Sequence, residues 1–296
     1  MVKTQTFQIK SNLVPSPIKY DVLFPKNYEK SNELYPLMLF LHGGGDRDRN
    51  ILKLVSPIMW DMWEKELVPE IVIATPSCSR SLYMDYKDGT EKWESFIMQE
   101  FLPSLKQDYR VVTDSNATFI GGISMGGLGA LRMGFKYLEK FGAIVAFEPG
   151  IEPAFEWHDV ELIDKFYRST EFMEKIFGSP FDEKYWNNNN PAFIAREKAE
   201  EIRKSDIKIY IEVGSEDFFG LFRGAEFLHR TLFDRNIPHE FRYVYGADHL
   251  GVSLKERIIN GFAFLNRIIN PLKEDPQTLR ILEFFIQMKE NAFKKK

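Results

Sequence analysis

Gly122-Ile123-Ser124-Met125-Gly126 places one serine between two glycines in a G-x-S-x-G pattern. The apolar run 117–120 comes just before it, and the helix-favouring run 128–135 comes just after it. A strand that turns sharply into a helix presents a serine hydroxyl at the edge of a sheet. Small residues must flank so tight a turn, and glycine also tolerates the positive φ values that such turns use. The stretch therefore predicts a strand, a tight turn and a helix, with Ser124 as the candidate nucleophile.

The composition limits the classes of protein to which this chain can belong. The chain has 296 residues, of which 44% are hydrophobic, so it can build a large buried core. Its 39 basic and 43 acidic residues give a net charge of −4, which argues against nucleic acid as a partner. Cys78 is the only cysteine of the sequence, so no disulfide is expected within the chain. We expect a cytoplasmic protein with no membrane partner, unless a signal peptide has been removed, because no signal-like or ~18-residue apolar stretch occurs.

Short apolar runs alternate with helical patterns along most of the chain. This order is typical of an α/β fold with a mainly parallel, doubly wound sheet. The first part differs, because 6–10 and 18–24 alternate apolar and polar residues and predict an antiparallel pair at one edge. The predicted buried strands are 37–41, 71–74, 117–120, 143–147, 207–213 and 241–245, and the predicted helices include 93–109, 128–140 and 224–235.

The whole chain, 1–296, is predicted to form a single domain. Two of its segments depart from the alternation of strands and helices. Residues 148–206 form a long, mostly helical interruption between two strands, which favours a lid or pocket wall over the active site. The alternative is an elaborated connection that only packs against the sheet. Residues 273–296 predict an appended C-terminal helix, and its apolar face is expected to dock on the body or on a second subunit, giving a homodimer. That face consists of Ile281, Phe284, Phe285 and Met288.

A serine is a poor nucleophile until a base takes its proton. In α/β hydrolases the acid and then the histidine follow the serine along the chain. His249 comes directly after the last buried strand, which puts it at the same sheet edge as Ser124. Asp217 follows the strand 207–213 and is the expected acid, with Glu216 and Glu148 as alternatives. Asp248, beside the histidine, is expected to point into solvent.

The tetrahedral intermediate of such a reaction needs backbone N–H donors aimed at its oxyanion. Met125, the residue after the nucleophile, is expected to supply one donor. The second is expected from the glycine-rich loop 41–46, where His42 has a structural role. No metal-ligand or phosphate-loop spacing competes with this interpretation, so neither metal nor cofactor is expected.

Together these segments resemble the esterase D group of α/β hydrolases, which includes S-formylglutathione hydrolases, feruloyl and acetyl esterases and mycolyltransferases. The resemblance implies Ser124, Asp217 and His249 as the catalytic triad, and the amides of Gly44 and Met125 as the oxyanion hole. True S-formylglutathione hydrolases carry a cysteine-containing oxyanion segment that differs from 41–46. The matching segments are Gly122-Ile123-Ser124-Met125-Gly126-Gly127, Tyr83-Met84-Asp85-Tyr86, Trp93-Glu94, Glu100-Phe101-Leu102-Pro103, Phe177-Gly178-Ser179-Pro180, Tyr185-Trp186, Asn190-Pro191 and Gly214-Ser215-Glu216-Asp217.

The sequence thus predicts a serine carboxylesterase that hydrolyses short to medium acyl or aryl esters through an acyl-enzyme intermediate. An acyltransferase or thioesterase with the same triad is the first alternative, because the sequence does not show which acceptor reaches the acyl-enzyme. A non-catalytic binding module on a hydrolase scaffold is the second. The expected partner is a small-molecule ester.

Overall fold

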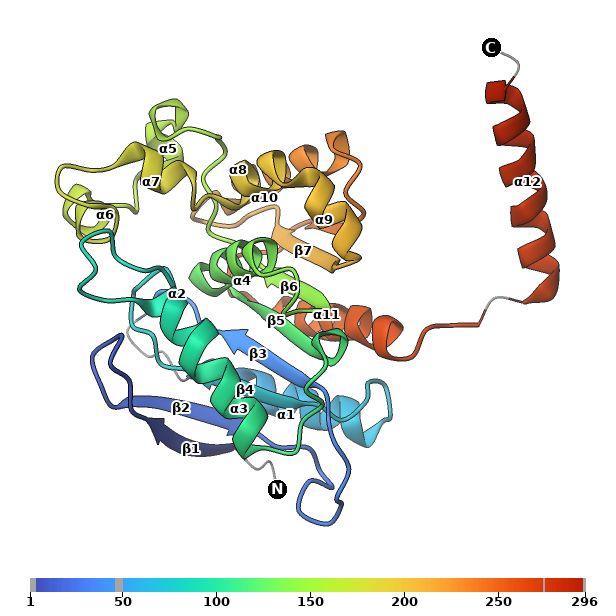
Figure 1. The fold of residues 1–296 in the computed structure, drawn as a ribbon, viewed down its shortest axis with the longest axis horizontal. Coiled ribbons are helices and arrows are strands. Elements are labelled where there is room, and N and C mark those ends of the chain that lie inside the picture. The colour runs from blue at the N-terminus through green and yellow to red at the C-terminus, as the bar shows by residue number, and fades with distance from the viewer. Residues whose placement is uncertain (1–3, 46–49, 274, 295–296) are drawn as a thin grey trace.

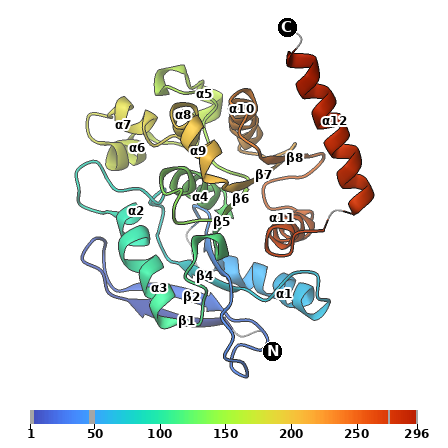
Figure 2. The same cartoon turned by 45° about the vertical axis from the view of Figure 1, so that its right-hand side comes forward.

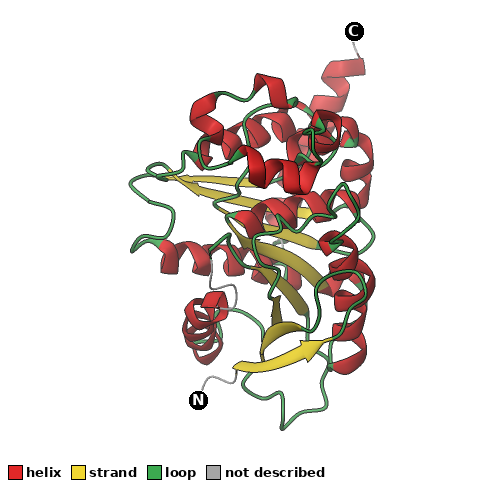
Figure 3. Ribbon diagram, turned by 90° about the vertical axis from the view of Figure 1, so that its left-hand side faces the viewer, coloured by secondary structure: helices red, strands yellow, loops and turns green. Residues whose placement is uncertain are grey.

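The computed structural model describes residues 4–45, 50–273 and 275–294, which form an eight-stranded sheet between two layers of helices (Figures 1 and 3). The order across the sheet is β1-β2-β4-β3-β5-β6-β7-β8. β1 pairs with β2, and β2 with β4, in antiparallel fashion, and all other neighbours are parallel. The predicted α/β-hydrolase fold with an antiparallel edge is therefore confirmed. The strands are β1 (Thr4–Ile9), β2 (Ile18–Leu23), β3 (Leu37–Leu41), β4 (Val72–Pro76), β5 (Thr118–Ile123), β6 (Ala143–Phe147), β7 (Lys208–Gly214) and β8 (Glu240–Val244).

The central strands β3, β5 and β6 are buried at every residue, as expected for parallel strands covered on both faces. Their register decides which loops meet. Leu41 at the end of β3 pairs with Gly122 of β5, so the glycine-rich loop leaves the sheet beside the Ser124 turn. Gly214 at the end of β7 pairs with Val244 at the end of β8, so the Asp217 and His249 loops also leave together.

Helices cover both faces of the sheet (Figure 3). α1 (Asn50–Glu64) and α11 (Leu254–Ile269) pack on one face against β-strand residues such as Met38, Phe40 and Phe119. α4 (Met125–Lys136) and α10 (Leu221–Asp234) pack on the other. The predicted helix 93–109 is present as a run of α2 (Trp93–Ser95), a π-helical turn (Phe96–Phe101) and α3 (Leu102–Asp108).

The predicted insertion is helical, and its helices begin at polar caps. Ser169, Asp182 and Asn190 each accept a backbone N–H near the start of a helix. The Asn190 side chain also donates to the Ala154 carbonyl at 2.8 Å, which links the start of α8 to the first part of the insertion. Its elements are a 3₁₀ turn (Trp157–Asp159), α5 (Leu162–Lys165), α6 (Thr170–Phe177), α7 (Glu183–Asn187), α8 (Pro191–Glu197) and α9 (Ala199–Ser205).

The appended helix α12 (Pro276–Lys294) is present but extends away from the body (Figures 1 and 2). No residue of α12 is buried, and Phe284 and Phe285 are 58% and 61% exposed. In this structure the helix therefore does not dock on its own body, which was one of the two expected sites. Among the described helices, α12 included, none combines the length and apolarity needed to cross a membrane.

Candidate active site

Ser124 lies at the junction of β5 and α4, where the chain reverses sharply. Its backbone has φ +59° and ψ −117°, a conformation that non-glycine residues rarely adopt. Hydrogen bonds hold it there: its N–H donates to the Phe147 carbonyl at 2.9 Å, and its own carbonyl accepts from Gly150 at 3.1 Å. The structure thus contains the predicted strand, tight turn and helix around Ser124.

The flanking glycines are required by close packing. A Cβ built on Gly122 would lie 2.5 Å from the Leu41 carbonyl oxygen, and one on Gly126 would lie 2.1 Å from that same atom. Neither glycine has a positive φ, so the expected reason for the pattern was only partly right. The backbone of β3 passes too near the turn for any side chain, while the unusual dihedral belongs to Ser124 itself.

Asp217 and His249 meet in the interior. The Oδ2 atom of Asp217 lies 2.5 Å from Nδ1 of His249, and each residue is 4% exposed. Burial opposes ionisation of Asp217, but the hydrogen bond and charge of His249 outweigh it and lower the pKa of this carboxyl. The alternative acid Glu216 is exposed to solvent.

Glu148, the other alternative acid, occupies a fully buried position directly beside this pair. Carboxylate oxygens of Glu148 and Asp217 and a ring nitrogen of His249 all lie within 4.8 Å of one another. Glu148 accepts a hydrogen bond from the Gly214 N–H at 2.9 Å and pairs with Nη1 of Arg257. Burial raises the pKa of Glu148 to about 8; the Arg257 charge opposes this shift, and the Asp217 carboxylate adds to it.

Arg257 is a site residue that sequence reasoning missed. It is 1% exposed on α11, and its Nη2 donates to the carbonyls of Asp248 at 2.7 Å and His249 at 3.3 Å. A single arginine among apolar residues on the buried face of a helix was the available signal. Arg257 thus ties α11 to the histidine loop and faces Glu148 at the same time.

Asp248 does not point freely into solvent, so that expectation was wrong. Its Oδ1 accepts hydrogen bonds from the backbone N–H of His249 at 2.6 Å and of Phe218 at 3.3 Å. The half-buried carboxylate therefore links the loop that carries Asp217 to the loop that carries His249.

Gly44 and Met125, the expected oxyanion donors, lie side by side. A Cβ built on Gly44 would be 3.9 Å from that of Met125. Met125 is the first residue of α4, so its N–H has no acceptor within the helix. His42 braces the glycine loop, since its Nε2 accepts the Cys78 N–H at 3.0 Å. Asp46, at the end of the expected loop 41–46, lies outside the described residues.

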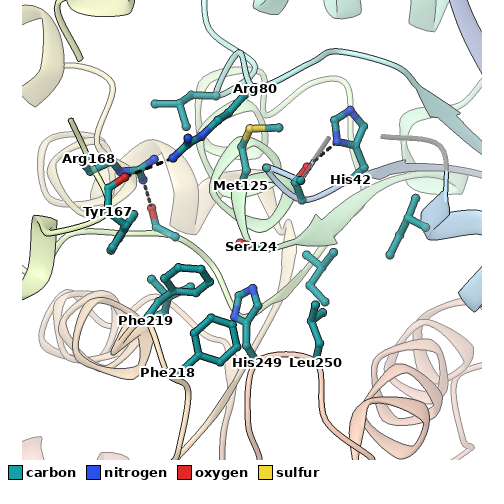
Figure 4. A pocket seen from close by; sticks show the side chains of 18 of the residues that line it. His42, Arg80, Ser124, Met125, Tyr167, Arg168, Phe218, Phe219, His249 and Leu250 are labelled. Carbon is teal, nitrogen blue, oxygen red and sulfur yellow. Dashed lines mark hydrogen bonds between the residues drawn. The ribbon is translucent and has the colours of Figure 1, made fainter. Parts of the chain in front are cut away.

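Ser124, His249, Gly44 and Met125 line one cavity of about 790 Å³ (Figure 4). Phe218 and Phe219 stand beside His249, and the two rings lie 5.4 and 5.1 Å from the imidazole. Tyr167 and Arg168 of the insertion line the far side, so this segment contributes a wall of the cavity. The remaining lining residues are Ile51, Leu54, Arg80, Leu82, Ile123, Gly43, Gly45, Gly150, His42, Leu221 and Leu250.

Two groups in the described part of the chain have the composition of a metal site. Glu148, Asp217 and His249 form one, but these atoms already bond to one another and to Arg257. Glu156, His158 and Glu183 form the other, a largely exposed group in which none of the three residues lines the cavity. Neither group carries a metal assignment here.

With this geometry established, comparison with known proteins identifies the family. Residues 11–252 match the model of the family described as Esterase. The chain belongs to the Esterase family. An acetyl esterase of Caldicellulosiruptor saccharolyticus is 30% identical over 152 residues, which are 50% of this chain and 55% of that protein. The chain thus spans about half of the length of this curated relative.

Solved structures share the fold over about nine-tenths of this chain. A ferulic acid esterase superposes with a TM-score of 0.73 at 23% identity, covering 90% of this chain and 99% of the other. An S-formylglutathione hydrolase from Agrobacterium tumefaciens superposes with a TM-score of 0.69 at 19% identity, covering 89% and 93%. These likenesses establish the α/β-hydrolase fold, and the family match confirms the resemblance seen in the sequence.

Proposed function

We propose that this member of the Esterase family is a serine carboxylesterase with Ser124, Asp217 and His249 as its triad. The observation that carries the proposal is the buried Asp217–His249 hydrogen bond of 2.5 Å, with both His249 and Ser124 lining the same cavity. Membership of the family and an acetyl esterase among the relatives support ester hydrolysis as the activity.

In the proposed reaction Ser124 attacks the ester carbonyl carbon while His249 takes the hydroxyl proton. Asp217 orients the imidazole and stabilises its cation, which matches an aspartate whose pKa is held low by that same histidine. The amides of Gly44 and Met125 receive the developing oxyanion. The protonated His249 then donates to the leaving alcohol oxygen, and a water that His249 deprotonates hydrolyses the acyl-enzyme.

The cavity supports short to medium acyl or aryl esters as substrates. Its apolar walls near His249 consist of Phe218, Phe219 and Leu250, with Ile51 and Leu54 further along. A volume of about 790 Å³ lies in the usual range for small-molecule sites and suits a modest acyl or aryl group. The insertion 148–206 is proposed to act as the lid or wall of this site within one domain.

Ser124→Ala tests the assignment. Purified parent protein is expected to hydrolyse p-nitrophenyl acetate and butyrate, and the variant to lose at least about 10³-fold in kcat because no other hydroxyl can form the acyl-enzyme. Ser16→Ala, in the exposed turn between β1 and β2, is the matched control and should keep the parent rate. Hydrolysis of these esters by Ser124→Ala at the parent rate would contradict the proposal.

A fluorophosphonate probe separates the alternatives. Labelling of Ser124 without turnover of these esters would favour an acyltransferase or thioesterase with the same triad. If the probe did not label Ser124 and no turnover were measured, these results would favour a non-catalytic binding module.

We further propose a homodimer formed through α12. The predicted apolar face, Ile281, Phe284, Phe285 and Met288, is at least 50% exposed. Beside it, Leu279, Leu282, Ile286 and Phe293 follow one another at steps of three, four and seven residues along a helix-pairing stripe, and all are at least 44% exposed. The charges along the helix are of both signs, Arg280 and Lys289 beside Glu283 and Glu290, which suits a protein helix better than an anionic membrane. A second copy of α12 offers the matching stripe.

A cytoplasmic location and the absence of nucleic-acid binding also remain proposals. The net charge of −4 supports the second of these. Fractionation of cells that express the full-length gene, and a gel-shift assay with mixed DNA and RNA, would test them.

A further inference from the structure

The charged groups that line the cavity are unevenly balanced. Among its described lining residues there are two arginines and no aspartate or glutamate. Arg168 is compensated, because its Nε lies 2.7 Å from Glu152 and the pair is buried. Arg80 forms no ion pair with any described carboxylate, although it lines the same cavity and is exposed to solvent. Among the described residues of the cavity, Arg80 is therefore the guanidinium that no carboxylate pairs with.

Arg80 is held in place by contacts that do not neutralise it. Its Cζ lies 4.5 Å from the centre of the Phe172 ring, and its Nη2 donates to the Tyr167 carbonyl at 3.2 Å. Both residues belong to the insertion, so the side chain spans from its own loop to the far wall. One carbonyl uses one of the five N–H donors of a guanidinium, which leaves a fork of donors for a ligand.

The same side chain runs along the expected oxyanion loop. A Cβ built on Gly44 would lie 3.8 Å from Cγ and 3.9 Å from Nε of Arg80. Figure 4 shows Arg80 above Met125 and reaching towards Tyr167, on the opposite side of Ser124 from Phe218 and Phe219. The guanidinium thus stands beside the reaction centre and faces the apolar half of the cavity across it.

The loop that carries Arg80 is rigidly braced. Nη2 of the fully buried Arg132 donates to the carbonyls of Leu82 at 2.8 Å and Tyr83 at 2.5 Å. The Tyr83 hydroxyl in turn donates to the His42 carbonyl at 2.9 Å. These bonds link the Arg80 loop to the glycine loop, so the position of the guanidinium is set relative to Gly44.

From this arrangement we infer that Arg80 forms a carboxylate-binding subsite, and that the preferred substrates are esters bearing a second, free carboxylate. The inference rests on the proposed esterase function and specifies its substrate class. A planar guanidinium binds a carboxylate through two parallel hydrogen bonds, which a neutral amide of the same shape cannot match. Aryl or alkyl parts of such an ester would contact the Phe218 and Phe219 side.

Matched substrate pairs test the subsite. One pair is 4-carboxyphenyl butyrate and 4-carbamoylphenyl butyrate, with the charge on the alcohol part. The other is the mono-p-nitrophenyl ester of adipic acid and its terminal amide, with the charge on the acyl part. The parent enzyme is expected to favour the carboxylate member of at least one pair by about tenfold in kcat/KM, since the guanidinium is partly screened by solvent.

Arg80→Gln should reduce that ratio to about one, and Arg80→Lys should restore only part of it because an ammonium lacks the planar fork. Because the ratio compares two substrates of the same protein sample, a general loss of activity or of folded protein does not change it. Arg230→Gln, an exposed arginine on α10 outside the cavity, is the control and should keep the parental ratio. The ratio should also shrink in 0.5 M salt for the parent enzyme.

Absence of a preference in both pairs, or a preference that survives Arg80→Gln, would overturn the subsite. Failure of the esterase assignment has a different signature, because no Ser124-dependent hydrolysis of either member of any pair would then be measured.

Discussion

Glu148 and Glu212 both face the guanidinium of Arg257 in the interior, so two buried carboxylates share one cation. Burial raises the pKa of each carboxyl above its ordinary value. Asp217, next to them, is the carboxyl whose pKa is lowered, because His249 compensates it. A carboxyl with a raised pKa and one with a lowered pKa thus lie side by side, and Asp217, whose pKa is lowered, is the one that hydrogen-bonds to the histidine.

Arg257→Met should be severely destabilising. The substitution keeps the length of the side chain but leaves Glu148 and Glu212 buried without their cation, which costs about 3–5 kcal/mol. Urea denaturation of the two proteins measures the loss. Arg267→Met is the control, because its pair with Glu240 is largely solvent-exposed and contributes about 0–1 kcal/mol. Equal effects of the two substitutions would contradict the buried network.

Glu148→Gln gives a pH-dependent difference in stability. The folded pKa of Glu148 is about 8 against 4.5 for the ordinary carboxyl, so the folded protein holds a proton that the unfolded chain releases. Its stabilising contribution is complete below pH 4.5 and is lost as the pH rises through 8. The variant lacks this titration, so its Tm should gain on the parent between pH 5 and pH 8.5. A Tm gap that stays constant over that range would refute the raised pKa.

At the scale of elements, most of the sheet follows from the sequence because its central strands are continuous apolar runs. The predicted 143–147 is β6 without any difference, and the run before Ser124 is β5. α1 and α11 were not predicted: α1 contains Pro57, and the apolar face of α11 is interrupted by Arg257. Pro57 is a local signal against a helix, whereas the burial of Arg257 depends on Glu148, a tertiary partner that a local pattern does not show.

The positions of Ser124, Asp217 and His249 were predictable, because each of these residues follows the end of one strand. Residues that act across elements were not. Arg257 reaches the histidine loop from α11, and Arg80 reaches the insertion from the loop after β4. Arg257 also pairs with Glu148, 109 residues away, and the partner of Arg80, Tyr167, is 87 residues away, so spacing alone does not reveal these contacts.

The junction of β5 with α4 and the end of β3 should tolerate no added atom. Gly122→Ala would place its Cβ 2.5 Å from the Leu41 carbonyl oxygen, so the backbone has to move at an expected cost of about 2–3 kcal/mol. Gly45→Ala is the matched substitution, since no atom of the residues that the structure describes lies within 4 Å of its added Cβ. Thermal unfolding of both variants provides the comparison, and a Gly122→Ala protein as stable as Gly45→Ala would contradict the close approach.

At the scale of the whole molecule, α12 is the part that the body leaves uncovered. An exposed apolar helix face of this length usually marks a contact surface. Leu282→Glu combined with Ile286→Glu should convert a dimer into a monomer, because the charges would enter the paired stripe. Light scattering after size exclusion gives the mass directly. Gln287→Glu, on the polar side, should leave the mass unchanged, and a parent protein that is already monomeric would refute the pairing.

The positive φ of Ser124 has a practical consequence for trapping substrates in this site. Alanine removes the hydroxyl but keeps the Cβ, so an inactive Ser124→Ala protein retains the steric strain of the turn. Glycine removes both, and the relief of strain offsets its greater chain entropy when unfolded. The hydroxyl of the proposed nucleophile is therefore held at a cost in stability, and Ser124→Gly is expected to be the more stable protein for co-crystals with intact esters.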